Sequence, residues 1–401
     1  MDRKWLIVCG SFVALALGAQ PMVLIAFTVL MPAIIVETGW SRGEISLAAL
    51  AFTLAGAAAM PVFGRLIDRF GLLRCIAIGA PLFLAALASI SMTSANPAHF
   101  LMLYGILGLL GTALTPLPYA KVIAQTFDAR RGLALGIAMA GTGFGSALIP
   151  ILANATIGGV GWRMTYVVLA SLSALGALTG VALIRSGTRT QAMGAAPAAS
   201  APAQAASPAA PAPRGGLLFG KLAVLVLLAS VALNGIPAHM AAIAGDRGVS
   251  GGFAAALVSV AGLSSLVGRI IAGWLLDRWH AANVGGLFFL LAIIGILALM
   301  SDNSTALLPV AACLFGLALG GEIDLVGYMV SRYFELRRYG ELYGWLLAIF
   351  TIGAGLGAYV MGLAFDRTGS YTIALAGFAA TLAVAILMLR SLGPYRHAAQ
   401  H

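Results

Sequence analysis

The sequence predicts an all-α polytopic membrane protein of about twelve transmembrane helices, arranged as two pseudo-symmetric six-helix bundles. Of its 401 residues, 61% are hydrophobic and only 9% are charged, whereas an ordinary soluble domain has roughly 25% charged residues. Apolar runs of about 20 residues or more recur along the whole chain, and each is long enough to cross a hydrocarbon core of about 30 Å as a helix. Several short motifs occur twice, about half a chain apart.

Polar breaks separate the expected helices from one another. The first run follows Arg3 and Lys4 and resembles a secretory signal. An apolar signal region spans roughly 7 to 15 residues, so this longer run is predicted to be a retained first helix. The twelve runs lie near residues 5–36, 44–66, 72–93, 98–126, 132–158, 162–184, 218–244, 251–276, 281–300, 304–331, 340–364 and 370–390.

The net charge of +10 is distributed unevenly. Basic residues gather at the ends of apolar runs and form no stripe with interleaved aromatics, so a nucleic-acid partner is not expected. With the N-terminus in the cytoplasm, nearly all Lys and Arg residues fall on that side, and only Arg42, Arg163, Arg247 and Arg367 fall outside. The positive-inside rule then predicts a multi-pass protein of the bacterial inner (plasma) membrane with both termini cytoplasmic.

The chain divides into two halves that repeat. Ser186–Pro213 is almost all Ala, Pro, Ser and Gln without a periodic apolar face, which indicates a disordered cytoplasmic linker. The predicted domains are therefore an N-terminal bundle (1–185), the linker (186–217) and a C-terminal bundle (218–401). GRLIDR in the first half recurs as GWLLDR in the second, and FDARRG recurs as FELRRYG. Such symmetry is expected for a transporter whose site lies at the repeat interface.

GRLIDRFGLLR, at Gly64–Arg74, resembles the signature loop of the major facilitator superfamily. Gly64 permits close helix packing, Asp68 can cap the N-terminus of a neighbouring helix, and Arg69 can pair with an acid. The reduced second copy, with Asp277 and Arg278, strengthens the resemblance, although it lacks the later Gly and Arg. These residues are predicted to form a conformational latch, and the alternative is a solvated basic turn.

TFDARRGLALGIAMAGTGFG, Thr126–Gly145, is similar to the fifth-helix signature of the monocarboxylate porter group, to which the oxalate/formate antiporters are related. Its glycines at helical spacing allow close approach of a partner helix, though plain packing is the alternative for each of them. The drug-efflux signature would place a Gly-Pro pair here. Gly145 precedes Ser146 instead, which argues against drug export.

Arg269 is the strongest candidate for substrate binding. It lies nine positions before Arg278, or about 13 Å deeper in the eighth run, where a guanidinium is costly unless paired. The resemblance implies that it binds a substrate carboxylate, which its fork can hold through two hydrogen bonds. The alternative is a structural ion pair with an acid on another helix. Ser265 stands where family members often carry an acid or amide, so the proton acceptor is expected elsewhere.

Two deep acids are candidates for proton coupling. Glu322 and Asp324 lie ten and eight residues before Arg332, and they project about 200° apart, so at most one is expected to face the cavity. The alternative makes both structural partners, including partners of Arg269. His239 and Tyr119 are further substrate-binding candidates, and the alternative for His239 is a hydrogen-bonded packing residue.

The resemblance implies a secondary active transporter that moves a small organic monocarboxylate with a proton by alternating access. No Lys occurs between Tyr339 and Asp366, where oxalate/formate exchangers carry one, which favours a single carboxylate. The alternatives are an exchanger or efflux carrier for a larger or aromatic acid and, more remotely, a non-transporting membrane sensor. No nucleophile–base pair, metal set or phosphate loop is found, and Cys9, Cys75 and Cys313 are scattered singly. We therefore expect a monomer in the lipid bilayer that is not an enzyme and needs neither cofactor nor metal.

Overall fold

The computed structural model describes residues 3–93, 96–194, 214–301 and 305–395. All regular structure in these ranges is helical, as predicted. Eleven spans among them are long and apolar enough to cross a membrane. The elements are α1 (Trp5–Ala16), a π-helical turn (Gln20–Ile25), α2 (Ala26–Thr38), α3 (Arg42–Phe70), α4 (Leu72–Ser89), α5 (Pro97–Gly111), α6 (Pro116–Thr126), α7 (Arg131–Gly194), α8 (Arg214–Asp246), α9 (Gly251–Leu276), α10 (Ala281–Met300), α11 (Leu307–Tyr333), α12 (Tyr339–Thr368) and α13 (Thr372–Arg390).

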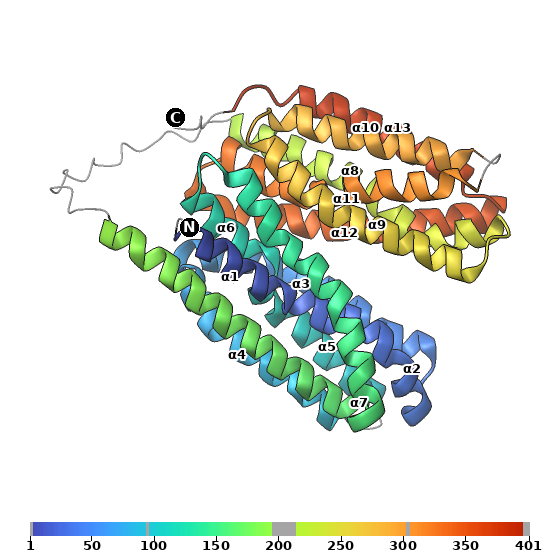
Figure 1. The fold of residues 1–401 in the computed structure, drawn as a ribbon, viewed down its shortest axis with the longest axis horizontal. Coiled ribbons are helices and arrows are strands. Elements are labelled where there is room, and N and C mark those ends of the chain that lie inside the picture. Colours follow the sequence, from blue (N-terminus) through green and yellow to red (C-terminus); the bar gives the residue numbers. More distant parts are fainter. Residues whose placement is uncertain (1–2, 94–95, 195–213, 302–304, 396–401) are drawn as a thin grey trace.

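Helix α7 accounts for two of the predicted runs. It is 64 residues long, but Gly161 has φ 76° and ψ 167°, a conformation that residues with a Cβ rarely adopt. Figure 1 shows that the chain reverses direction within α7. The span at residues 131–188 therefore crosses twice, which reconciles eleven observed spans with twelve predicted runs.

The fourth run is interrupted in its middle. A short 3₁₀ turn at Thr112–Leu114 follows α5, and α6 begins at Pro116. Proline has no backbone N–H and cannot continue a helical ladder, but it suits a first helical position. The interruption contributes residues to the cavity described below.

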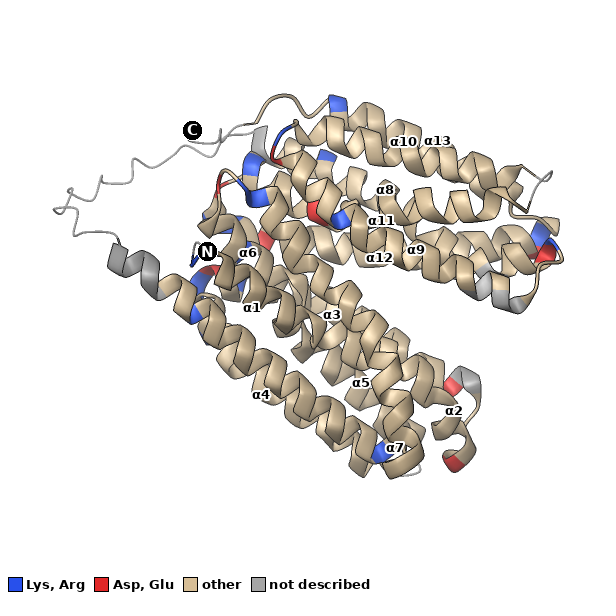
Figure 2. Ribbon diagram, viewed as in Figure 1, with Lys and Arg blue, Asp and Glu red and all other residues tan. Residues whose placement is uncertain are grey.

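The helices lie in two groups, α1–α7 and α8–α13 (Figure 1). Contacts between the groups run mainly along α3 with α12 and along α7 with α9. Lys and Arg gather at the end of the molecule where α1 begins and α13 ends (Figure 2). We call this end the basic end. Its residues, at or near the ends of α3, α6, α9 and α11 and the start of α7, include Arg65, Lys121, Arg131, Arg278 and Arg332.

The ends of the predicted linker differ from the expectation of disorder. Helix α7 continues through residues 186–194, and α8 already begins at Arg214. Proline is the residue that interrupts a helix most strongly, and the first proline of the segment comes only at Pro197, after the end of α7. The remainder of the predicted linker, residues 195–213, lies outside the described residues.

Candidate functional site

A cavity of about 340 Å³ lies between the two groups of helices. The N-terminal group contributes residues from the first span, α3, the α5–α6 interruption and α7, and the C-terminal group contributes residues from α8, α11 and α12. Its polar lining consists of Gln20, Thr53, Thr112, Thr115, Thr142, Asn234 and Thr351. The cavity wall is therefore uncharged and largely apolar.

Arg269 forms an ion pair with Asp324 across the interface of α9 and α11. Nη1 of Arg269 lies 3.2 Å from Oδ1 of Asp324, whose side chain is completely buried. The two helices approach closely here, because a Cβ at Gly320 would overlap the carbonyl oxygen of Ser265. Oδ2 of Asp324 has no hydrogen-bond partner among the described residues. Arg269 is therefore paired with an acid on another helix, which the sequence analysis gave as the alternative to substrate binding.

Glu322 lies on a different side of α11. Its Oε2 accepts a hydrogen bond from Nδ2 of Asn234 at 3.1 Å, and its Oε1 has no partner among the described residues. Glu322 also borders a void of about 10 Å³ against α10. Ile323, between the two acids, lines the central cavity, whereas neither acid does. The sequence allowed one of the two acids to face the cavity, and neither lines it in this conformation.

The other two predicted substrate residues lie apart from Arg269. Nε2 of His239 is 3.0 Å from the carbonyl oxygen of Ala358, and Nδ1 is 3.4 Å from the hydroxyl of Tyr371. Tyr119 is buried in α6, and its hydroxyl has no partner in the part of the chain that the structure describes. Neither residue, nor Arg269, is part of the cavity lining. The structure therefore does not bring the three predicted substrate-binding residues together.

At the basic end, Asp68 joins the two halves. Its carboxylate accepts hydrogen bonds from the backbone N–H groups of Gly340 and Glu341, both at 2.9 Å, at the start of α12. Nζ of Lys121 lies 2.7 Å from the same carboxylate. A Cβ at Gly64 would overlap the carbonyl oxygen of Gly340. Asp68 thus caps a neighbouring helix N-terminus, in the geometry expected from the motif.

Asp277 makes the equivalent contact from the second half. It accepts hydrogen bonds from the backbone N–H groups of Gly132 at 2.6 Å and Leu133 at 2.9 Å, at the start of α7. Burial raises the pKa of Asp277, and these two hydrogen bonds oppose that rise. A Cβ at Gly132 would overlap the carbonyl oxygen of Gly273. Each half therefore caps one helix of the other.

The two motif arginines, Arg69 and Arg278, contact aromatic rings of their own half, whereas the sequence predicted that they belong to the latch. Arg69 lies over the ring of Phe70, 5.2 Å from its centroid, and Arg278 lies over the ring of Trp274 at 3.8 Å. The acid across the interface, Glu341, is instead paired with Arg65 at 3.0 Å. Successive residues on a helix differ by about 100°, so Arg65 and Arg69 start from similar directions. Only the course of α12 decides which of them reaches the acid.

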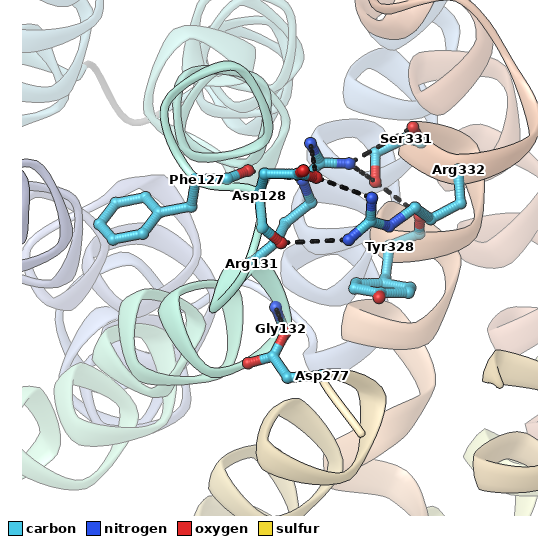
Figure 3. A network of polar contacts seen from close by, with 8 residues as sticks. All are labelled: Phe127, Asp128, Arg131, Gly132, Asp277, Tyr328, Ser331 and Arg332. Atoms are coloured by element: carbon cyan, nitrogen blue, oxygen red, sulfur yellow. Dashed lines mark hydrogen bonds and ion pairs between the residues drawn. The ribbon is translucent and has the colours of Figure 1, made fainter. Parts of the chain in front are cut away.

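A further polar network crosses the basic end (Figure 3). Arg332 of α11 donates to the Asp128 carboxylate at 2.8 Å and to its carbonyl oxygen at 3.1 Å. Arg131 donates to the Ser331 hydroxyl at 3.1 Å and to the Phe127 carbonyl oxygen at 2.8 Å. These contacts join the FDARRG motif of the first half to the end of α11, directly before FELRRYG in the second half.

Sequence reasoning missed several residues of these sites, among them Lys121, Asn234 and Arg65. In the sequence, Lys121 and Arg65 do not differ from the other basic residues that are predicted to lie on the cytoplasmic side. Asn234 lies in the middle of the seventh run, as a lone amide among apolar residues. A polar side chain at that depth is a signal that could have identified it.

Comparisons with known proteins agree with this architecture. The chain matches the family Major Facilitator Superfamily at residues 6–340 and 222–400. Human monocarboxylate transporter 11 is 29% identical over 358 residues, covering 84% of this chain and 70% of the relative. Monocarboxylate transporter 13 of Bos taurus is 28% identical over 320 residues, covering 78% and 71%.

Solved structures with the same fold include two transporters. The human organic anion transporter MFSD10 has a TM-score of 0.74 at 16% identity, with coverage of 96% of this chain and 99% of the other. The fucose:proton symporter of E. coli has a TM-score of 0.71 at 16% identity, with coverage of 98% and 100%. Together with the family match over nearly the whole chain, the paired helix caps identify this protein as a member of the major facilitator superfamily of membrane transporters.

Proposed function

We propose that the protein moves a small organic monocarboxylate together with a proton by alternating access. The observation that carries the proposal is the buried ion pair of Arg269 with Asp324. Arg269 uses Nη1 for this contact, and a guanidinium has five N–H donors in a planar fork. It can therefore receive a carboxylate once its present partner is neutralised.

Proton binding provides that neutralisation. A proton on Asp324 or Glu322 removes a negative charge near Arg269, so the site gains attraction for an anionic substrate. Release of the substrate restores the intramolecular pair, and the empty carrier remains electrically compensated. The relatives named as monocarboxylate transporters support this choice of substrate class.

Arg269 must reach the substrate from behind the cavity wall. In the present conformation the cavity is lined instead by Asn234, Ile323 and Thr351 from the C-terminal half. We infer that rocking of the halves about the α7–α9 and α3–α12 contacts brings the Arg269 region into the cavity. Binding at a repeat interface with rigid-body rocking is the usual behaviour of such folds.

The basic end is proposed to face the cytoplasm of a bacterial inner membrane, with both termini inside. The excess of Lys and Arg at that end supports this orientation (Figure 2). The caps made by Asp68 and Asp277 join the two halves at the basic end, and with this orientation we propose that the structure is an outward-facing or occluded state. The residues around these caps are proposed to be the conformational latch: Gly64, Asp68, Arg65, Asp277 and Gly132.

The test is uptake into proteoliposomes that contain the purified protein, with and without an imposed pH gradient. A panel of radiolabelled small monocarboxylates and larger aromatic acids separates the proposal from its alternative, a carrier for a larger organic acid. The cavity wall includes Phe52, Met60 and Phe350, which could accommodate an aromatic ring. Uptake of small monocarboxylates that a pH gradient accelerates supports the proposal, and uptake of aromatic acids alone supports the alternative.

A further inference from the structure

The two acids of α11 differ in the charge of their partners. Asp324 is paired with the Arg269 guanidinium. Glu322 has only the neutral amide of Asn234 on one oxygen, and its other oxygen has no hydrogen bond within the described residues. An ionised carboxylate removed from water needs a cation or several hydrogen bonds to offset its desolvation. Of the two acids, Glu322 is therefore the one that lacks a cation or enough hydrogen bonds to be ionised. A bound proton removes the charge that would need them.

Among the described residues, the cation that acts on Glu322 is Arg269, and it is already paired with Asp324. On α8 the facing polar group is Asn234, and on α9 it is Arg269, which acts on Glu322 through space. On α10 the neighbouring side chain is the apolar Phe288. The remaining titratable groups nearby, Asp324 on α11 and Tyr343 on α12, lie around the Arg269–Asp324 pair. The Arg269–Asp324 pair has no net charge, so an ionised Glu322 leaves this region with a negative charge.

Asn234 connects Glu322 with the cavity. Asn234 lines the cavity and Glu322 does not. Both side-chain hydrogen bonds of Asn234 come from Nδ2, which donates to Glu322 at 3.1 Å and to the carbonyl oxygen of Ser230 at 3.2 Å. The amide oxygen is thus the polar group left to face a substrate. An oxygen acceptor at that place disfavours a carboxylate anion.

We propose that Asn234 determines the specificity of the cavity for an anionic substrate, because its amide changes orientation with the protonation state of Glu322. A proton from water adds to the Glu322 carboxylate, and its new O–H becomes a hydrogen-bond donor. The Asn234 amide then turns to offer its oxygen to Glu322, which directs its NH₂ group into the cavity. This rests on the proposed function, because the NH₂ group would hydrogen-bond to a substrate carboxylate.

Rotation of the Asn234 amide breaks hydrogen bonds and forms new ones. It gives up the Nδ2 bond to Ser230, whose carbonyl oxygen keeps its backbone partner in the helix. The proton supplies the new O–H bond to Asn234 in exchange. This O–H bond replaces the hydrogen bond that Nδ2 of Asn234 now donates to Glu322, and the proton returns to water when Glu322 ionises again. Binding of the proton therefore raises the affinity for the anion, and binding of the anion raises the affinity for the proton by the same factor.

The first experiment needs no substrate. Infrared difference spectra between acid and alkaline pH, recorded on the full chain in lipid, contain the C=O stretching band of any carboxylic acid that titrates. We expect this band in the wild type and in Asp324→Asn, its loss in Glu322→Gln, and its shift in Asn234→Leu, which has a similar volume and no amide. Loss in Asp324→Asn with retention in Glu322→Gln overturns the proposal, and so does an unshifted band in Asn234→Leu.

Folding is monitored by size-exclusion chromatography of each variant. If Glu322→Gln does not fold, the Asn234→Leu shift and the Asp324→Asn spectrum still decide between the two acids. These spectra do not depend on which substrate is carried. Failure of the proposed function therefore leaves this test intact.

The second experiment uses radiolabelled L-lactate as the probe, in exchange at equal pH on both sides of the membrane. We expect the wild-type KM to rise about tenfold or more from acid to alkaline pH, as for loss of a hydrogen bond to a charged group. Asn234→Leu should flatten this KM profile with little change in kcat, and Asn234→Gln, which keeps an amide, should partly restore it. Ser264→Ala, a polar change on α9 outside the cavity, is the matched control. A wild-type pH profile in Asn234→Leu overturns the proposal, whereas absence of lactate exchange in the wild type counts against the proposed function alone.

Discussion

Asp277 accepts a hydrogen bond from the backbone N–H of Gly132 at 2.6 Å, and so joins the end of α9 to the start of α7. Asp68 makes the matching contact with Gly340 at 2.9 Å. A carboxylate at a helix N-terminus satisfies N–H groups that have no partner within the helix and interacts favourably with the helix dipole. Two caps therefore join the halves at the basic end, and in the proposed function both must break before this end opens.

Replacing Asp277 with Asn should shift the population toward opening of the basic end. The variant loses the negative charge, and an amide NH₂ would meet the N–H groups that the carboxylate now accepts. We expect a cost of about 1–2 kcal/mol, or a roughly 5–30-fold change in population. Distances between spin labels on α7 and α9 at the basic end, measured by electron paramagnetic resonance, report the change.

Arg69→Ala is the control for this measurement. Arg69 contacts the ring of its neighbour Phe70, so its loss should leave the distance distribution close to wild type. A wild-type distribution in Asp277→Asn, or an equal shift in both variants, would contradict the assignment of Asp277 as a latch residue.

Replacing Gly132 with Ala should block full closure of the basic end. The added Cβ would overlap the carbonyl oxygen of Gly273 and lie 2.9 Å from Cβ of Leu276. Overpacking of this kind costs about 1–3 kcal/mol, and transport should fall by about tenfold or more. Gly158→Ala is a matched control on α7, because nothing lies within 4 Å of a Cβ there. Equal transport rates in the two variants would show that close approach at Gly132 is not needed.

Replacing Arg269 with Lys should weaken carboxylate binding while the protein stays folded. Lysine retains the charge but cannot reproduce a two-pronged contact. Uptake kinetics in proteoliposomes should show a KM raised by about tenfold or more, as expected for one lost charged hydrogen bond. Normal uptake kinetics would remove Arg269 from the substrate site.

Replacing Asp324 with Asn should destabilise the protein, because it leaves the partly buried Arg269 without its counter-ion. Breaking one side of a buried pair costs about 3–5 kcal/mol, which lowers the Tm. The double variant Arg269→Gln with Asp324→Asn should recover part of that loss, since neither group is then charged. A double variant no more stable than Asp324→Asn would show that the pair is not the source of the effect.

Replacing Glu322 with Gln should separate two activities. Counterflow at equal pH should persist, because the loaded carrier still changes conformation, whereas accumulation driven by a pH gradient should be lost. Asp324→Asn is the comparison. If both variants still concentrate substrate after a pH jump, neither acid carries the proton, and His239 becomes the next candidate.

The fold follows from local features of the sequence. An apolar run of sufficient length in lipid must form a helix, since every backbone N–H and C=O group needs a partner. The predicted runs agree with the observed helices within a few residues, and Gly161 lies in the gap predicted between the fifth and sixth runs. The departures are the interruption of the fourth run at Thr112–Leu114 and the helical ends of the predicted linker. The capping role of Asp68 was also predictable, because the motif places a carboxylate at a helix end next to a glycine that allows close approach.

The partners across helices were decided only by tertiary structure. Glu322 and Asn234 are 88 residues apart in the chain, and Arg269 and Asp324 are 55 apart. The helical period fixes the direction in which each side chain projects from its own helix, but not which helix lies in that direction. The sequence alone therefore determined that deep charges exist and need partners. Helix packing places Asp324 beside the Arg269 guanidinium and Glu322 beside the Asn234 amide, and it puts Ile323 in the cavity wall.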